Sequence, residues 1–339
     1  MADTAFSWFG GTIGSGGVQT EYNYPNHLIA TGRVMSDDDF TVDIFNQHII
    51  STYGSDLTYM DIRNEWLTHG VLDWGGGDYA LRLMVYKNIM PPATGLAEYG
   101  DKCYWLSEPY IGYETVGADF PGMPETATMY GKMFSSVVGQ SDNVLWGKLW
   151  VAMYADAYFE TDVRTCLANV ASTLPAGSFP KYLYDKCVAL HTTNSTDWRW
   201  AVGQILLEQK PIYKISMLNL KDRDPDMCNA FGLLAILYGN NDYTQTITIS
   251  ALAGYDGDCT SAGIGGLMGI IKGTAGTPSQ VMTSIYASGN GVYVAAPSFD
   301  PPAAYFVVDL FECKPPSLLR KWPPMRTSKR LSLDSRPCS

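Results

Sequence analysis

Two short acidic clusters are the residues of this chain whose types and spacing could do chemistry. The first reads SDDDFT at positions 36–41, and the second reads YDGDC at positions 255–259. A hard cation such as Mg²⁺ needs several carboxylate oxygens that converge from different parts of a chain. An EF-hand is excluded, because the sixth position counted from Asp256 is Ser261 instead of Gly and the twelfth is Leu267 instead of Glu. The two clusters together therefore predict a cation site, provided that the fold brings them to one place.

The same clusters also have an ordinary structural explanation, because each precedes a segment with helical character. Ser36 can cap a helix, and carboxylates near a helix N-terminus gain about 0.3–1 kcal/mol from the helix dipole. An unrelated helical scaffold, whose aspartates act only as caps, is therefore an alternative to the metal site.

The elements that must position the clusters are predicted to be helices. Val42, Phe45 and Ile49 follow helical spacing, and Gly54 ends that pattern. Thr58 and Asp61 form a capping-box pattern, with Asp in place of Glu, at the start of the next helix. Further amphipathic segments are expected at about 78–88, 124–138, 142–159, 161–174, 178–192, 196–209, 227–239, 242–254 and 260–272. Because strands and helices do not alternate, the fold class is predicted to be all-α.

Composition limits the class of protein. The 339 residues are 46% hydrophobic and 17% charged, which is typical of a folded protein with one large core. The net charge of −11 argues against a nucleic-acid partner, and no apolar run approaches the roughly 18 residues of a membrane span. The seven cysteines form no C-x-x-C pair and the four histidines do not cluster in sequence, so we expect free thiols and no zinc centre. We expect a cytoplasmic protein, although a secreted form without its signal peptide would have the same features.

The C-terminal part of the chain has a different composition. After about residue 290 the helical period gives way to two β-prone runs around a Pro-rich turn, which predict a short β-hairpin near 292–312. Residues 314–339 hold seven Lys or Arg and one Asp, a charge of +6 that leaves −17 on the rest. We therefore divide the chain into a helical domain at 1–290 and a divergent, Pro-rich, basic extension at 291–339.

Six features in the same order resemble the ADP-ribosylglycohydrolase family. SDD at 36–38 matches its S/T-D-D motif, and GYDGDC at 254–259 matches its G-x-D-x-D-C/S/T motif. The other four matching segments are GGTIGSGGVQTE, NIMPPATG, YIGYETVGADFPGMPETA and the NAFGLLAILYG helix that leads into the second motif. The resemblance spans about residues 10–275. It implies an orthogonal multi-helix bundle that hydrolyses the glycosidic bond of an ADP-ribosyl group.

The resemblance also implies roles for individual residues. The implied metal ligands are Ser36, Asp37, Asp38, Asp256, Asp258 and Thr260, the catalytic acid or base is Glu21, and the substrate side carries Gly122, Gln140 and Asn229. Thr260 is preferred to Cys259 because a thiol is a poor ligand for Mg²⁺. Two Mg²⁺ ions, with Mn²⁺ as a substitute, would orient the ribose hydroxyls and activate water. The expected partner is an ADP-ribosylated protein or an ADP-ribose derivative, bound by a monomer.

Two differences from the family pattern keep a second alternative open. Gln140 lies about where relatives often have a histidine, and no histidine precedes the Asn229–Ala230 pair. An inactive relative that binds ADP-ribose, or has a structural role, would also carry these differences. Because only some closely spaced positions share one face of a helix, we expect Asp39 and Asp43 to point away from the metal centre.

Overall fold

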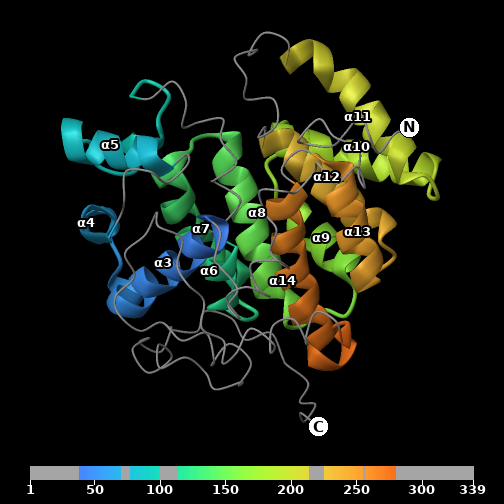
Figure 1. Ribbon diagram of the computed structural model, residues 1–339, viewed down its shortest axis with the longest axis horizontal. Coiled ribbons are helices and arrows are strands. Elements are labelled where there is room, and N and C mark those ends of the chain that lie inside the picture. The colour runs from blue at the N-terminus through green and yellow to red at the C-terminus, as the bar shows by residue number, and fades with distance from the viewer. Residues whose placement is uncertain (1–37, 70–76, 100–113, 214–224, 255–256, 280–339) are drawn as a thin grey trace, which may run out of the picture.

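The computed structural model describes residues 38–69, 77–99, 114–213, 225–254 and 257–279 (Figure 1). Every secondary-structure element in these ranges is helical, which confirms the all-α prediction. The elements are α3 (Asp38–Tyr53), η1 (Gly54–Asp56), α4 (Tyr59–His69), α5 (Gly77–Lys87), η2 (Ala93–Gly95), α6 (Thr115–Ala118), α7 (Pro124–Val138), α8 (Asp142–Ala157), α9 (Val163–Ala171), α10 (Phe179–Thr193), α11 (Trp198–Tyr213), α12 (Pro225–Tyr238), α13 (Tyr243–Ala253) and α14 (Gly257–Gly276). None of these helices combines the length and apolar composition needed to cross a bilayer. The predicted hairpin near 292–312 and the domain boundary at 290 lie outside the described residues.

The turn between α3 and α4 forms as its sequence predicts. Gly54 has a φ of +60°, a left-handed conformation that favours glycine, and it ends α3. The backbone nitrogen of Thr58 donates to the Asp61 carboxylate at 2.9 Å, and the nitrogen of Asp61 donates to the Thr58 hydroxyl at 3.3 Å. This reciprocal capping box starts α4.

Helix α8 lies at the centre of the molecule. In Figure 1 the chain from α3 to α5, coloured blue to cyan, lies on the left, and α10 to α14 lie on the right, with α8 between them. Helix α8 packs against α6, α7, α9, α10, α12 and α14. It is buried on nearly every side, as expected for a helix that is apolar around its whole circumference.

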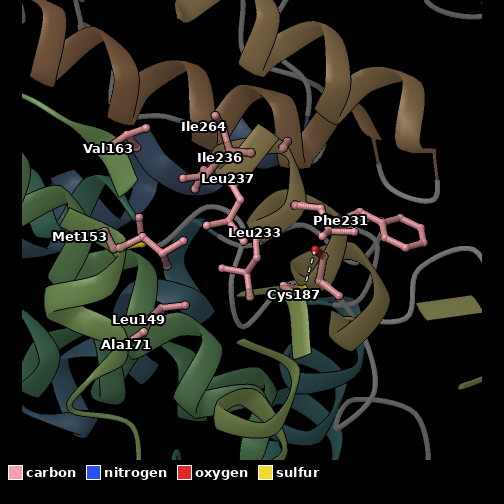
Figure 2. Packing of buried hydrophobic residues seen from close by; sticks show 14 of the residues in the cluster. Leu149, Met153, Val163, Ala171, Cys187, Phe231, Leu233, Ile236, Leu237 and Ile264 are labelled. Carbon is pink, nitrogen blue, oxygen red and sulfur yellow. Dashed lines mark hydrogen bonds between the residues drawn. The ribbon is translucent and has the colours of Figure 1, made fainter. Parts of the chain in front are cut away.

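Two hydrophobic clusters meet at α8. The first is built from α8 to α14, and Figure 2 shows part of it, including Met153, Leu233 and Ile264 from three different helices. The second is built mainly from α3, α4, α5 and α7, and it includes Val151 and Ala155 from the other face of α8. One face of α8 therefore belongs to the first cluster, and the opposite face belongs to the second.

The described cysteines are free thiols, as the sequence predicts. Cys187 is fully buried in the first cluster and donates to the carbonyl oxygen of Ala230 at 3.6 Å, the dashed line in Figure 2. Burial raises the pKa of the Cys187 thiol, so it remains protonated and belongs to the core.

Candidate active site

Both predicted acidic clusters lead directly into helices. Asp38 is the first residue of α3, and Asp258 is the second residue of α14. Three other predicted ligands, Ser36, Asp37 and Asp256, lie outside the described residues, as does the predicted catalytic Glu21. The structure therefore locates the two helices that carry the clusters, and the ligand roles remain predictions.

The first turn of α6 lies between these two helices. The Thr115 hydroxyl donates to Asp43 of α3 at 2.7 Å, and its carbonyl oxygen accepts from the Gln47 amide at 3.1 Å. The preceding residue, Glu114, is only 7% exposed and reaches α14. Its Oε1 atom lies 3.1 Å from the point where a Cβ on Gly263 would stand.

This arrangement bears on whether the two acidic clusters converge. Asp43 lies about one and a half helical turns after Asp38, the acidic residue at the start of α3. Gly263 lies the same distance after Asp258, the acidic residue at the start of α14. Both positions contact consecutive residues, Thr115 and Glu114, at the start of α6. The early turns of α3 and α14 therefore approach one place, which we call the α3–α6–α14 junction.

Tyr154 of α8 completes this junction. Its hydroxyl donates to the carbonyl oxygen of Gly263 at 2.7 Å. Burial raises the pKa of Tyr154 well above its usual value, and the negative charges of Glu114 and Asp43 raise it further. The tyrosine is therefore a neutral donor in a region of negative potential. Carboxylates in such a region are the donor type that a hard cation prefers.

The carboxylate of Asp43 faces α6, where it accepts from Thr115. The expectation that Asp43 points away from the metal centre stays a prediction, because the described residues do not locate that centre. The residue is half-buried, and its charge acts on Tyr154. Asp43 therefore belongs to the junction.

Asp119, at the other end of α6, is a second carboxyl group that sequence patterns did not single out. Burial raises its pKa to about 7, although a hydrogen bond from Gln47 opposes the shift. Its Oδ2 atom is buried and has no hydrogen-bond partner among the described residues. A carboxyl group of this kind can give or take a proton near neutral pH.

Gln140 contacts the chain just after the NIMPPATG segment, one of the segments that carried the family resemblance. It lies between α7 and α8, and its Oε1 accepts from the backbone nitrogen of Ala97 at 3.3 Å. Nearby, the Thr94 hydroxyl donates to the carbonyl oxygen of Val137 at 2.7 Å. A Cβ on Gly95 would lie 2.5 Å from the Gly139 carbonyl oxygen, so close approach of the two segments requires glycine there.

Asn229 is part of the core. The residue is 0% exposed, its Oδ1 accepts from the Trp150 indole at 2.6 Å, and its Nδ2 donates to the Pro225 carbonyl at 2.6 Å. These bonds join α8 to the first turn of α12. Asn229 therefore has a structural role, because its amide is directed to groups inside the protein, and its expected contact with substrate stays a prediction.

The other two described site residues lie in close packing positions. Thr260 is 4% exposed, and its Cγ2 lies 2.9 Å from where a Cβ on Gly232 would stand, so its methyl group faces α12. Gly122 precedes α7 with a φ of +70°, and its nitrogen donates to the Ala155 carbonyl oxygen at 2.8 Å. Their roles toward metal and substrate remain predictions.

Comparison with known proteins decides the family. A family model described as ADP-ribosylglycohydrolase matches residues 115–296, which is more than half of the 339 residues. The chain belongs to the ADP-ribosylglycohydrolase family. No curated protein and no solved structure gave a significant match. An ADP-ribosylglycohydrolase domain indicates hydrolysis of ADP-ribosyl linkages, and the family is in general metal-dependent.

The matched part of this ADP-ribosylglycohydrolase contains the second acidic cluster but not the first. It begins at Thr115, directly after Glu114, while α3 precedes it. Sequence reasoning did not select Glu114, because it forms no acidic cluster: the largely apolar segment YIGYETVGADF holds only one other acidic residue, Asp119, five positions later. The informative signal was a charged residue in a segment that otherwise predicts burial.

Proposed function

We propose that the chain is a metal-dependent hydrolase that cleaves the glycosidic bond between an ADP-ribosyl group and a protein or a small molecule. The observation that carries the proposal is Glu114, a buried carboxylate beside α14 whose chain neighbour Thr115 is hydrogen-bonded to α3. Two further observations support the proposal. The chain belongs to the ADP-ribosylglycohydrolase family. The two helices that begin at the acidic clusters also approach the α3–α6–α14 junction, where Glu114 and Asp43 contribute negative charge.

The proposed metal ligands come from two sides of the junction. Ser36, Asp37 and Asp38 lead into α3, while Asp256, Asp258 and Thr260 belong to the start of α14. When bound there, two Mg²⁺ or Mn²⁺ ions would orient the ribose hydroxyls and lower the pKa of the attacking water.

The remaining roles belong to protein groups. Glu21 is the proposed acid or base for the leaving group and the water. Glycoside hydrolysis passes through a transition state with positive charge on the sugar ring. The negative potential that Asp43 and Glu114 contribute favours that charge over the neutral ground state.

The test is release of ADP-ribose from a panel of substrates. The purified chain is incubated with proteins ADP-ribosylated on arginine, on serine or on carboxylates, and with small ADP-ribose derivatives, each with Mg²⁺ or with EDTA. We expect release from at least one substrate with Mg²⁺ and none with EDTA. Asp38→Asn and Asp256→Asn should abolish it while the protein stays folded, because removing one of several like charges relieves repulsion.

A matched control uses the same chemical change at another helix start. Asp142 is the acidic residue in the first turn of α8, so Asp142→Asn removes a carboxylate without touching either cluster. It should retain turnover. Equal loss of ADP-ribose release in all three variants would contradict the assignment of the metal ligands. Absence of turnover on every substrate would contradict the proposal that the chain is a hydrolase.

An inactive relative that binds ADP-ribose is the second candidate. Gln140 favours it, because a side chain near the position of the family histidine is engaged with the Ala97 backbone. Isothermal titration with ADP-ribose separates the candidates. Binding without turnover on any substrate favours this alternative over the hydrolase.

A further inference from the structure

Helices α3 and α4 bring two histidines and a glutamate together, none of which belongs to the aspartate clusters. The Nε2 atom of His48 lies 3.0 Å from Glu65 Oε2, and the Nε2 atom of His69 lies 3.4 Å from the same oxygen. One ligand atom from each residue can be chosen so that all three lie within 4.8 Å of one another. We call these three residues the His–Glu cluster.

The fold fixes the positions of these side chains. Glu65 and His69 are four residues apart on α4 and therefore share one face, while His48 comes from α3. The two imidazole rings meet edge to face with centroids 5.3 Å apart, and the His69 ring also contacts Phe45.

The carboxylate of Glu65 is oriented by a second residue. The Tyr53 hydroxyl donates to Oε1 at 2.6 Å, while both histidine nitrogens approach Oε2. Hydrogen bonds of this kind from outside the ligand set orient metal-binding carboxylates in known sites. Oε2 is thus directed toward the histidines as a single ligand atom.

The separations suit a tetrahedral ion. Zn²⁺ with bonds of about 2.0–2.2 Å places its ligand atoms roughly 3.3–3.6 Å apart. The two contacts to Glu65 Oε2, at 3.0 and 3.4 Å, lie close to that range. The side chains of His48, Glu65 and His69 retain 15%, 12% and 20% exposure, so an ion and one water can reach them.

We propose that His48, Glu65 and His69 form a binding site for a zinc-class divalent ion, with water at the fourth position. Imidazole nitrogen favours Zn²⁺, Co²⁺, Ni²⁺ or Cu²⁺ over Mg²⁺, which prefers an all-oxygen set. A bound ion would join α4 to α3, the helix that begins at Asp38. The site is separate from the proposed Mg²⁺ ligands and does not depend on the hydrolase assignment.

The test measures metal binding by the full chain after chelator treatment and dialysis. Zn²⁺ is titrated calorimetrically with 1 mM Mg²⁺ present, and Co²⁺ is titrated by absorption. We expect one Zn²⁺ per chain to bind at this cluster, and His48→Gln and His69→Gln to weaken binding at least tenfold. Glutamine can still hydrogen-bond to Glu65, so loss of binding reports on ligation. Tyr53→Phe should weaken affinity by about 10–100-fold.

His191→Gln is the matched control. This histidine lies on α10, where its ring contacts Tyr238, and it should be irrelevant to Zn²⁺ binding. The Co²⁺ spectrum should lack an intense thiolate charge-transfer band, which excludes the cysteines as ligands. If a histidine variant fails to fold, as judged by circular dichroism, the Tyr53→Phe titration and the Co²⁺ spectrum decide. Absence of Zn²⁺ binding by the wild type, or equal affinity in all folded variants, would overturn the proposal.

Discussion

The Tyr154 hydroxyl donates to the carbonyl oxygen of Gly263, and this bond depends on a missing side chain one turn further along α14. A Cβ on Gly266 would stand 2.2 Å from the same hydroxyl oxygen. Glycine at 266 therefore lets Tyr154 reach its acceptor, which joins the central helix α8 to α14 at the junction.

Gly266→Ala should destabilise the protein by about 1–3 kcal/mol, because the tyrosine or the helix must shift. The control is Gly269→Ala on the same helix, where nothing lies within 4 Å of an added Cβ. That variant should gain about 0.5–1 kcal/mol from helix propensity. Urea unfolding of both variants measures the difference. Equal effects of the two substitutions would show that the Tyr154 contact does not restrict position 266.

Asn229→Ala should lower the free energy of unfolding by roughly 1–3 kcal/mol, because the buried Trp150 indole loses its acceptor. A residue that served only to contact substrate would behave differently. Its loss would reduce turnover and leave stability unchanged. Urea unfolding combined with the ADP-ribose release assay separates the two roles.

The stability of the protein should depend on pH through Asp119. Its folded pKa is about 7, above the value of about 4 that is usual for an unfolded aspartate. The folded state therefore binds more protons between these values, so this contribution is fully present below about pH 4 and is lost as pH rises toward 7. Asp119→Asn should flatten the pH dependence of the melting temperature in that window. An unchanged profile would contradict the shifted pKa.

Gly122→Ala should be more costly than Gly177→Ala, although both glycines have positive φ, +70° and +83°. Each substitution should cost about 1–2 kcal/mol for the left-handed backbone. At Gly122 the new Cβ would also stand 2.6 Å from the Phe159 ring, whereas nothing lies within 4 Å at Gly177. Thermal unfolding compares them, and a Phe159→Ala background should remove the excess cost at Gly122. Persistence of that excess would point to another cause.

Local patterns predicted the helices well, because their determinants are close in sequence. The Thr58–Asp61 capping box and the left-handed Gly54 both follow from residue type and spacing within a few positions. The all-α class followed from the same periodicity.

Contacts between distant segments could not be predicted in this way. Glu114 and Thr115 are important because Glu114 lies beside α14 while Thr115 is bonded to α3, and no spacing rule connects those helices. The four histidines seemed too dispersed for a metal centre, yet the turn after α3 brings His48 and His69 to one carboxylate. Asn229 matched a family motif in sequence, but only its burial revealed that its amide holds two helices together.

Helix α8 contributes side chains to both hydrophobic clusters, and this limits how the chain can be divided into separately folding fragments. The segment matched by the family model, residues 115–296, contains α8 but not α3, α4 or α5. Expressed alone, it would present Phe134, Val151 and Ala155 to solvent, since their cluster is completed by those earlier helices. We therefore expect the matched segment not to fold on its own, and amide protons in α8 should exchange only when the two cores open together.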